Sequence, residues 1–161
     1  MRARQLHGGV VTTGVFNKIY TDAQLYNLPM QFADLSELDR VRERLDPVLM
    51  AGLEEKGFVT FGLSEVGSAY AMGKRKATSI EDARSLKVWT PEGDDAALRT
   101  LQAFGITPIP SPIANVLTGL QTGLFDTVAS PPVAAVALQW HTQVDYLLDM
   151  PLMYVYGLFV V

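Results

Sequence analysis

The sequence contains few side chains that could perform acid–base, nucleophilic or metal chemistry. It has two histidines, His7 and His141, and no cysteine, which excludes thiolate catalysis, thiolate metal sites and disulfide bonds. It also lacks a Gly-x-Ser-x-Gly nucleophile motif, a phosphate-binding loop, a dinucleotide fingerprint and a calcium loop. The lack of these residues and motifs favours a protein that binds a ligand rather than one that catalyses a reaction, and we expect no metal and no cofactor.

Two of the candidate ligand-binding residues follow apolar runs, and each also has a purely structural interpretation. Trp89 ends a strand expected over 87–90, where its ring forms either a flat pocket wall or part of the core. Glu65 follows a strand expected over 58–63 and lies either on a cleft-facing loop or on a solvated one. The residues alone leave both alternatives open.

Further candidates lie where expected helices begin. Asp94 is first of all a helix cap, and that role needs no ligand. Ser130 and Pro131 end a strand and either face a ligand or only lead into the next helix. Trp140 and His141 lie on an expected helix over 132–142, where His141 is either a surface histidine or a ligand contact.

Alternating strands and helices predict an α/β fold with a mainly parallel sheet. The expected strands are 10–13, 58–63, 87–90, 106–109, 124–129 and 153–161. The expected helices are 36–55, 95–104, 113–122 and 132–142. One helical turn is expected after Ser79, and the end of a helix over 1–6. Within 36–55, the helix is expected to restart at Pro47, with Asp46 as its cap. Ligands of such sheets bind beyond the carboxyl ends of the strands, which here are 12–14, 64–67, 90–94 and 130–132.

Composition narrows the functional classes further. The 161 residues are 48% apolar and 19% charged, which fits one domain or two small lobes and excludes a disordered chain. The net charge is −4 and no basic run is longer than Lys74–Lys76, so we expect no nucleic-acid partner. No apolar run reaches the length of about 18 residues that spans a membrane, and the first residues do not form an export signal. Both ends of the chain resemble cut ends, which suggests a fragment.

Four segments resemble the solute-binding proteins of TRAP transporters, the DctP-like family, in the order in which that family carries them. Residues 105–126 resemble its Gly-x-x-Pro-x-Pro strand, its helix ending in Leu-Gln-Thr-Gly, and the Asp that follows. Residues 79–88 resemble the turn before its central strand, and residues 1–11 and 27–32 resemble two segments of its first half. The resemblance therefore covers essentially the whole chain.

This resemblance implies a periplasmic-binding-protein-like, two-lobed α/β fold that is incomplete at both ends. Residues 1–60 would form part of lobe I, residues 61–150 lobe II, and residues 151–161 a strand that crosses back toward lobe I. Such a protein would lie in the periplasm, bind a small organic solute and deliver it to the membrane subunits of a TRAP permease. The expected ligand-binding residues are Trp89, Glu65, Asp94, Ser130, Pro131, Thr13, Tyr70 and Trp140.

The chain departs from the family at three positions whose side chains usually bind a carboxylate of the solute. Trp89 follows Leu86-Lys87-Val88, where the family has an Arg, and Ala69 stands two residues after Gly67, where a second Arg is common. Ser130 aligns with a family asparagine. Because Trp cannot replace a bidentate Arg–carboxylate fork, we expect a neutral or largely apolar solute rather than a C4-dicarboxylate. A cationic solute is a sub-alternative, since Trp89 could offer a cation–π face with Glu65 or Asp94 nearby.

Two other interpretations remain open at this point. The scaffold could carry a lyase-like or dehydratase-like enzyme, for which Glu65, Asp94 and His141 are the acid–base candidates. The chain could also be a fragment without independent function, with unpaired sheet edges that promote self-association.

Overall fold

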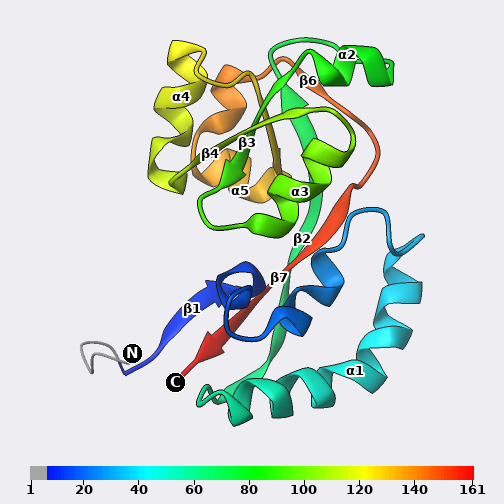
Figure 1. The fold of residues 1–161 in the computed structure, drawn as a ribbon, viewed down its shortest axis with the longest axis vertical. Helices are drawn as coiled ribbons and strands as arrows, with labels where there is room; N and C mark the ends of the chain where they lie inside the picture. The colour runs from blue at the N-terminus through cyan, green and yellow to red at the C-terminus, as the bar shows by residue number, and fades with distance from the viewer. Residues whose placement is uncertain (1–6) are drawn as a thin grey trace. The chain divides into compact units, whose positions relative to one another are not determined.

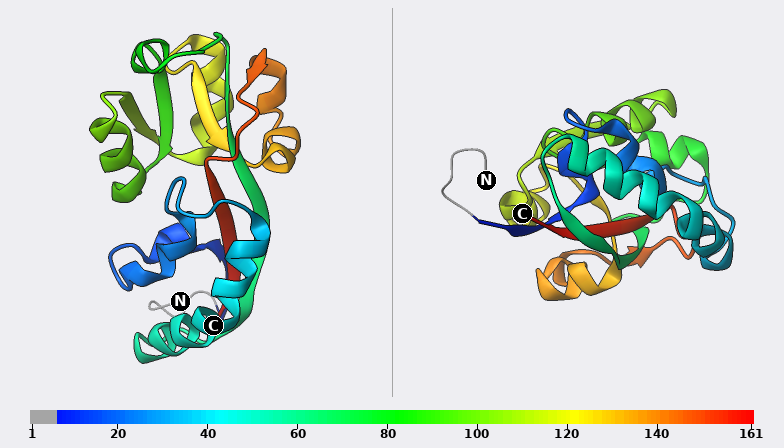
Figure 2. Two further views of the ribbon diagram at one scale, coloured as in Figure 1. Left: turned by 90° about the vertical axis from the view of Figure 1, so that its right-hand side faces the viewer. Right: turned by 90° about the horizontal axis from the view of Figure 1, so that it is seen from below.

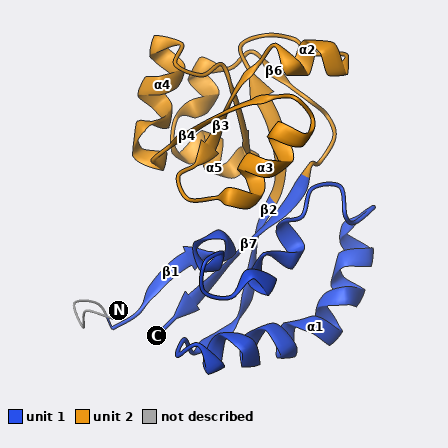
Figure 3. Cartoon of the chain, in the orientation of Figure 1, with its two compact units in different colours: residues 1–67, 153–161 blue, residues 68–152 orange. Residues whose placement is uncertain are grey.

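The computed structural model describes residues 7–161 (Figure 1) and divides into two compact units (Figure 3). Unit 1 comprises residues 1–67 and 153–161, and unit 2 comprises residues 68–152. The chain passes from one unit to the other inside strand β2 (Thr60–Gly73) and again just before strand β7 (Met153–Val160). The lobe boundaries expected at 60 and 150 remain predictions. The helix end expected over 1–6 lies outside the described residues.

Unit 1 is a small sheet covered by helices on its apolar face. Strand β7 lies between β1 (Gly9–Thr12) and the first part of β2, and it pairs with β1 in antiparallel register. The covering helices are the 3-10 helices η1 (Thr13–Phe16) and η2 (Thr21–Asn27) and the long helix α1 (Leu35–Glu55). Figure 2 shows α1 beside β2 and β7, where Leu38 and Leu49 pack against Leu63, Tyr154 and Tyr156.

The sheet of unit 2 is mixed. The second part of β2 pairs antiparallel with β5 (Thr127–Ser130) and with the short strand β6 (Tyr146–Leu147). Strand β3 (Lys87–Pro91) runs parallel to both β5 and β4 (Thr107–Ser111). The expectation of a mainly parallel sheet is therefore wrong for the chain as a whole: only the strands joined by crossover helices are parallel.

The helices of unit 2 follow its strands. Helix α2 (Ile80–Arg84) precedes β3, α3 (Asp95–Ala103) joins β3 to β4, and η3 (Ile113–Asn115) with α4 (Val116–Thr122) joins β4 to β5. Helix α5 (Pro132–Ala137) and η4 (Trp140–Gln143) follow β5. The core consists of buried side chains from these helices, from three strands and from the loop before β5: Met72, Trp89, Val116, Leu120, Phe125, Val128, Ala135 and Trp140.

Several helix boundaries are where local signals predict them. Ser79 and Asp82 form the expected reciprocal capping box at α2, and the carboxylate of Asp94 accepts from the N–H of Ala97 at 3.0 Å to cap α3. Gly123 ends α4 in the left-handed conformation with φ of 73°. These boundaries depend only on side chains within a few residues.

Three expectations about elements are wrong. Helix α1 does not restart at Pro47 but continues through it, because the Asp46 carboxylate binds Arg42 and Tyr26 instead of capping a new helix. The helix expected over 132–142 breaks at Gln139, whose φ is 61°, and this turn brings Trp140 into the core. The strand expected to end at 63 continues to Gly73, so residues 64–67 are strand rather than loop.

No helix within the described residues is long and apolar enough to cross a membrane.

Candidate functional site

The carboxyl ends of the parallel strands of unit 2 carry several of the predicted ligand-binding residues. Strands β3, β4 and β5 end at Pro91, Ser111 and Ser130. Because ligands of α/β sheets bind beyond these ends, this edge is the candidate solute site of unit 2. Trp89, Asp94, Ser130 and Pro131 lie on it or directly after it.

Trp89 is a core residue of unit 2. Its side chain is 6% exposed, and its indole Nε1–H donates to the carbonyl oxygen of Ser111 at 2.9 Å. Its ring meets the ring of Trp140 edge-to-face, with centroids 5.5 Å apart. The sequence left open whether the Trp89 ring forms a pocket wall or part of the core, and its burial fits the core. A contact of Trp89 or Trp140 with solute stays a prediction.

Tyr70, Ser130 and Pro131 lie together at the end of β5. Tyr70 on β2 is the register partner of Ser130, and both Ser130 and Pro131 are buried. Within residues 7–161, the Ser130 hydroxyl donates only to the adjacent carbonyl of Pro131, at 3.3 Å, so it keeps most of its hydrogen-bonding capacity. Tyr70 is half-buried and is the most exposed of the three residues, so a solute could reach it most easily.

Negative charge follows β3. Glu92, Asp94 and Asp95 lie in the turn after the strand and in the first turn of α3. The basic residue nearest to them in sequence, Arg99, is one turn further along α3 and donates through Nε to the carbonyl oxygen of Asp95 at 3.2 Å. This part of the carboxyl edge is therefore net negative.

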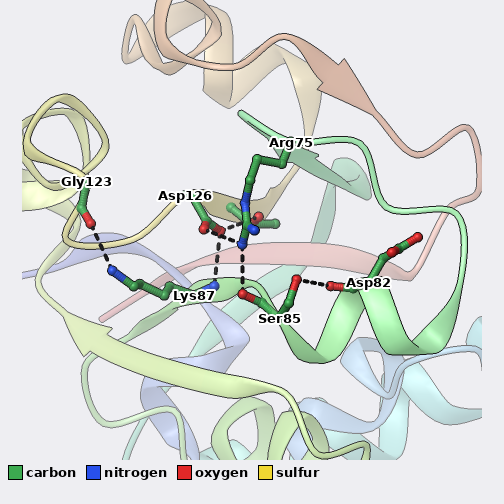
Figure 4. A network of polar contacts seen from close by, with 7 residues as sticks. Arg75, Asp82, Ser85, Lys87, Gly123 and Asp126 are labelled. Atoms are coloured by element: carbon green, nitrogen blue, oxygen red, sulfur yellow. Dashed lines mark hydrogen bonds and ion pairs between the residues drawn. The ribbon is translucent and has the colours of Figure 1, made fainter.

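Basic residues gather at the opposite edge of unit 2, around Asp126 (Figure 4). The Asp126 carboxylate accepts from the Lys87 backbone N–H, the Thr127 hydroxyl and the Arg75 guanidinium, each at 3.0 Å. Arg75 also donates to the carbonyl oxygen of Ser85 at 2.7 Å, and Lys87 Nζ donates to that of Gly123 at 3.4 Å. Lys74 Nζ donates to the carbonyl oxygen of Leu120. This network joins the starts of β3 and β5 to the end of β2.

The other two predicted residues belong to unit 1. Thr13 follows β1 and is fully buried, and its hydroxyl has no hydrogen-bond partner among residues 7–161. Glu65 is exposed, but it lies within β2 rather than on the predicted loop. The expectation of a loop fails because Gly62 and Gly67, with φ of 138° and 133°, let the strand bend without ending.

The acid–base candidates Asp94 and His141 are engaged in structural contacts. The Asp94 carboxylate caps α3, and Nδ1 of His141 lies 3.3 Å from the carbonyl oxygen of Ala135. No group of three or more metal-binding side chains gathers within residues 7–161. A role of Glu65, Asp94 or His141 in catalysis stays a prediction.

A partly buried polar cluster in unit 1 was missed by sequence reasoning. Nη2 of Arg42 donates to Asp46 Oδ2 at 2.9 Å and to the carbonyl oxygen of Leu63 at 2.8 Å, and its guanidinium lies 4.5 Å from the centre of the Tyr156 ring. The Tyr26 hydroxyl donates to Asp46 Oδ1 at 2.7 Å. The four-residue spacing of Arg42 and Asp46 on an expected helix was a visible signal for their pairing.

Burial is the largest single influence on the pKa of Tyr26, Tyr156 and Arg42. It raises the pKa of Tyr26 far above its ordinary value, and the hydrogen bond to Asp46 raises it further. Burial also raises the pKa of Tyr156, against the lowering effect of the Arg42 charge. For Arg42, burial lowers the pKa, but the hydrogen bond to Asp46 and the charge of that carboxylate outweigh it. Both tyrosines are therefore neutral and Arg42 is cationic at neutral pH.

Comparison with known proteins identifies the family. The family model of bacterial extracellular solute-binding proteins, family 7 (DctP), matches residues 1–161. The uncharacterized protein YiiZ of Salmonella typhimurium is 29% identical over 120 residues, which are 72% of this chain and 36% of that protein.

Solved TRAP periplasmic solute-binding proteins share the fold. One from Haemophilus influenzae, with bound L-gulonate, has a TM-score of 0.91 at 17% identity over 99% of this chain and 52% of its own. One from Sulfurospirillum deleyianum, with bound succinate, has a TM-score of 0.87 at 22% identity over 96% of this chain and 50% of its own. The chain spans about half the length of these proteins and shares the α/β fold of that half. It belongs to family 7 of the bacterial extracellular solute-binding proteins, the DctP family.

Proposed function

We propose that the protein is the periplasmic solute-binding subunit of a TRAP-type secondary transporter, which binds a small organic solute and delivers it to the membrane subunits of a permease. The match of the family model to the whole chain is the observation that carries this proposal. Solved relatives of the same fold hold small organic molecules such as L-gulonate and succinate, which supports it.

We further propose that the solute is neutral or largely apolar rather than a C4-dicarboxylate. The support comes from charge at the candidate edge of unit 2, where Glu92, Asp94 and Asp95 follow β3 and the basic residues around Asp126 lie at the other edge. A carboxylate placed there without an arginine would be desolvated and unpaired, which costs several kcal/mol. Trp89 adds little to this argument because its ring is buried. An amine-bearing solute remains the sub-alternative, with Asp94 or Glu65 as its counter-charge.

The proposal also names contacts. The Tyr70 and Ser130 hydroxyls offer hydrogen bonds to a neutral polar solute at the end of β5, next to Pro131. In unit 1, Thr13 directly follows β1, and its buried hydroxyl has no partner in the part of the chain that the structure describes. Because the Thr13 side chain is fully buried, a solute could reach its hydroxyl only if the packing around η1 opened.

Binding to a matched pair of sugars tests the proposal. The protein, purified in the longest form that its gene encodes, is titrated calorimetrically with D-galactose, D-galacturonate and succinate, and its co-purified molecules are identified by native mass spectrometry. We expect a retained neutral molecule, or D-galactose bound more tightly than D-galacturonate. Tight binding of succinate or D-galacturonate would overturn the neutral solute while leaving the transport role in place.

Two further outcomes concern the function itself. If the protein retains no small molecule and binds none of the three probes, the solute-binding role is wrong. If a retained molecule is converted to a product at a rate that depends on Glu65, Asp94 or His141, the enzyme alternative is correct. The variant Asp94→Asn tests whether negative charge at this edge disfavours a carboxylate. Asparagine caps a helix as well as aspartate does, so the variant removes one negative charge and keeps the cap. In this variant, the difference between the affinities for D-galactose and D-galacturonate should be smaller.

A further inference from the structure

Strand β2 contains a short segment between two glycines, which lies beside β7 in the sheet of unit 1. Gly62 and Gly67 both adopt positive φ, and between them only the Leu63 side chain is buried, while Ser64, Glu65 and Val66 are exposed. Glycine at such positions permits a bend but also permits other backbone paths, because it has no side chain to restrict them. Pairing with β7 holds the strand in the sheet, and a side-chain contact to its backbone would restrict this segment further.

Arg42 provides such a contact. It reaches from α1 to the carbonyl oxygen of Leu63, the first residue after Gly62, and donates to it at 2.8 Å. The same Nη2 binds Asp46, and the guanidinium packs on Tyr156 of the neighbouring strand β7. Tyr26 from η2 donates to the other oxygen of Asp46 at 2.7 Å. Arg42 and Asp46 together thus connect four elements, and one of their hydrogen bonds is made to the backbone of β2.

The environment of Arg42 argues against a role in stability alone. Its side chain and that of Asp46 are each about one-fifth exposed, with relative exposures of 20% and 22%. Replacing a largely buried ion pair by uncharged groups of similar size is often neutral or stabilising, because the desolvation of both charges is avoided. In some proteins such pairs instead specify one conformation among several.

We propose that Arg42 is a positioning residue, which with Asp46 fixes the backbone of β2 between Gly62 and Gly67 and thereby orients Glu65. This rests on the proposed function only where Glu65 is concerned, since Glu65 is one of the residues proposed to face the solute. The fixed backbone itself is a property of unit 1 and does not depend on solute.

Amide hydrogen exchange, followed residue by residue without solute, tests this proposal. The variant Arg42→Met/Asp46→Asn removes both charges, keeps the packing of the long side chain, and leaves an acceptor for Tyr26. We expect exchange at Ser64, Glu65 and Val66 to accelerate at least about tenfold, while exchange in the buried part of α1 around Leu49 changes less than about threefold. The exposed Arg44 on the same helix is the control: Arg44→Met should change neither region.

Three results would overturn the proposal. Exchange at 64–66 within about twofold of the native chain shows that Arg42 does not fix the segment, and equal acceleration throughout unit 1 shows a general loss of stability. If the double variant does not fold, Arg42→Lys is used instead, because it keeps the charge but loses the planar guanidinium. Selective acceleration of exchange at 64–66 in this variant supports the proposal, and unchanged exchange there refutes it. Solute affinity is measured separately, so that the role of Arg42 in the segment is tested even if the protein binds no solute.

Discussion

Asp126 offers the sharpest test of what organises unit 2. Its side chain is 17% exposed and accepts three hydrogen bonds, from the Lys87 backbone, the Thr127 hydroxyl and Arg75. Replacing it by alanine leaves the Lys87 N–H and the Thr127 hydroxyl without this acceptor. Each of these bonds joins an uncharged donor to a partly exposed carboxylate, and at about 1 kcal/mol each the two contacts account for about 2 kcal/mol of unfolding free energy.

The contact with Arg75 adds less. Arg75 is 52% exposed and keeps the carbonyl oxygen of Ser85 as a partner, so its loss of Asp126 costs about 0.5 kcal/mol. Asp126→Ala should therefore destabilise the chain by about 2–3 kcal/mol. Asp126→Asn keeps one acceptor oxygen for the backbone and should cost about 1 kcal/mol.

Urea unfolding followed by tryptophan fluorescence measures these effects, since Trp89 and Trp140 both lie in the core of unit 2. Arg75→Met is the matched control and should cost less than about 1 kcal/mol. If Asp126→Ala costs no more than Arg75→Met, the ion pair rather than the backbone contacts carries the effect, and the reasoning is refuted.

Three further predictions concern other parts of the chain. Gly119→Ala should destabilise by about 1–3 kcal/mol in urea unfolding, because a Cβ would overlap the ring of the fully buried Phe125; a cost below about 0.5 kcal/mol would contradict the packing. Raising the pH above about 10 should lower the unfolding free energy, because the unfolded chain releases tyrosine protons that folded Tyr26 retains. In Tyr26→Phe this dependence on pH should be shallower, and an unchanged slope would exclude Tyr26 as a source. Ser79→Ala should cost about 1 kcal/mol through loss of the α2 cap, whereas Ser79→Asp should cost little; equal costs for the two variants would show that the cap is not the cause.

The features that sequence reasoning predicted correctly depend on neighbours along the chain. The caps at Ser79 and Asp94 and the left-handed Gly123 are set by hydrogen bonds and φ values within one turn. The features it missed depend on distant residues. Pro47 does not start a new helix, because the carboxylate before it binds Arg42 and Tyr26, and Tyr26 comes from another element.

The candidate site shows the same division. A strand pattern places Trp89 at a carboxyl end, but it does not say which face the ring takes. The ring lies on the face with Trp140, which is available only because the backbone turns at Gln139. The loop expected at Glu65 is strand instead, because Gly62 and Gly67 adopt positive φ within β2 without ending it.

The position of β7 has a consequence for how the chain folds as it is synthesised. Unit 2 is one continuous stretch, so all of its strands are made before β7. Unit 1 cannot close at that stage, because β7 lies between β1 and β2, and β1 has no other partner among the described strands. Strands β1 and the first part of β2 therefore lack their common neighbour until residues 153–160 leave the ribosome, so the order of synthesis delays the closing of this sheet.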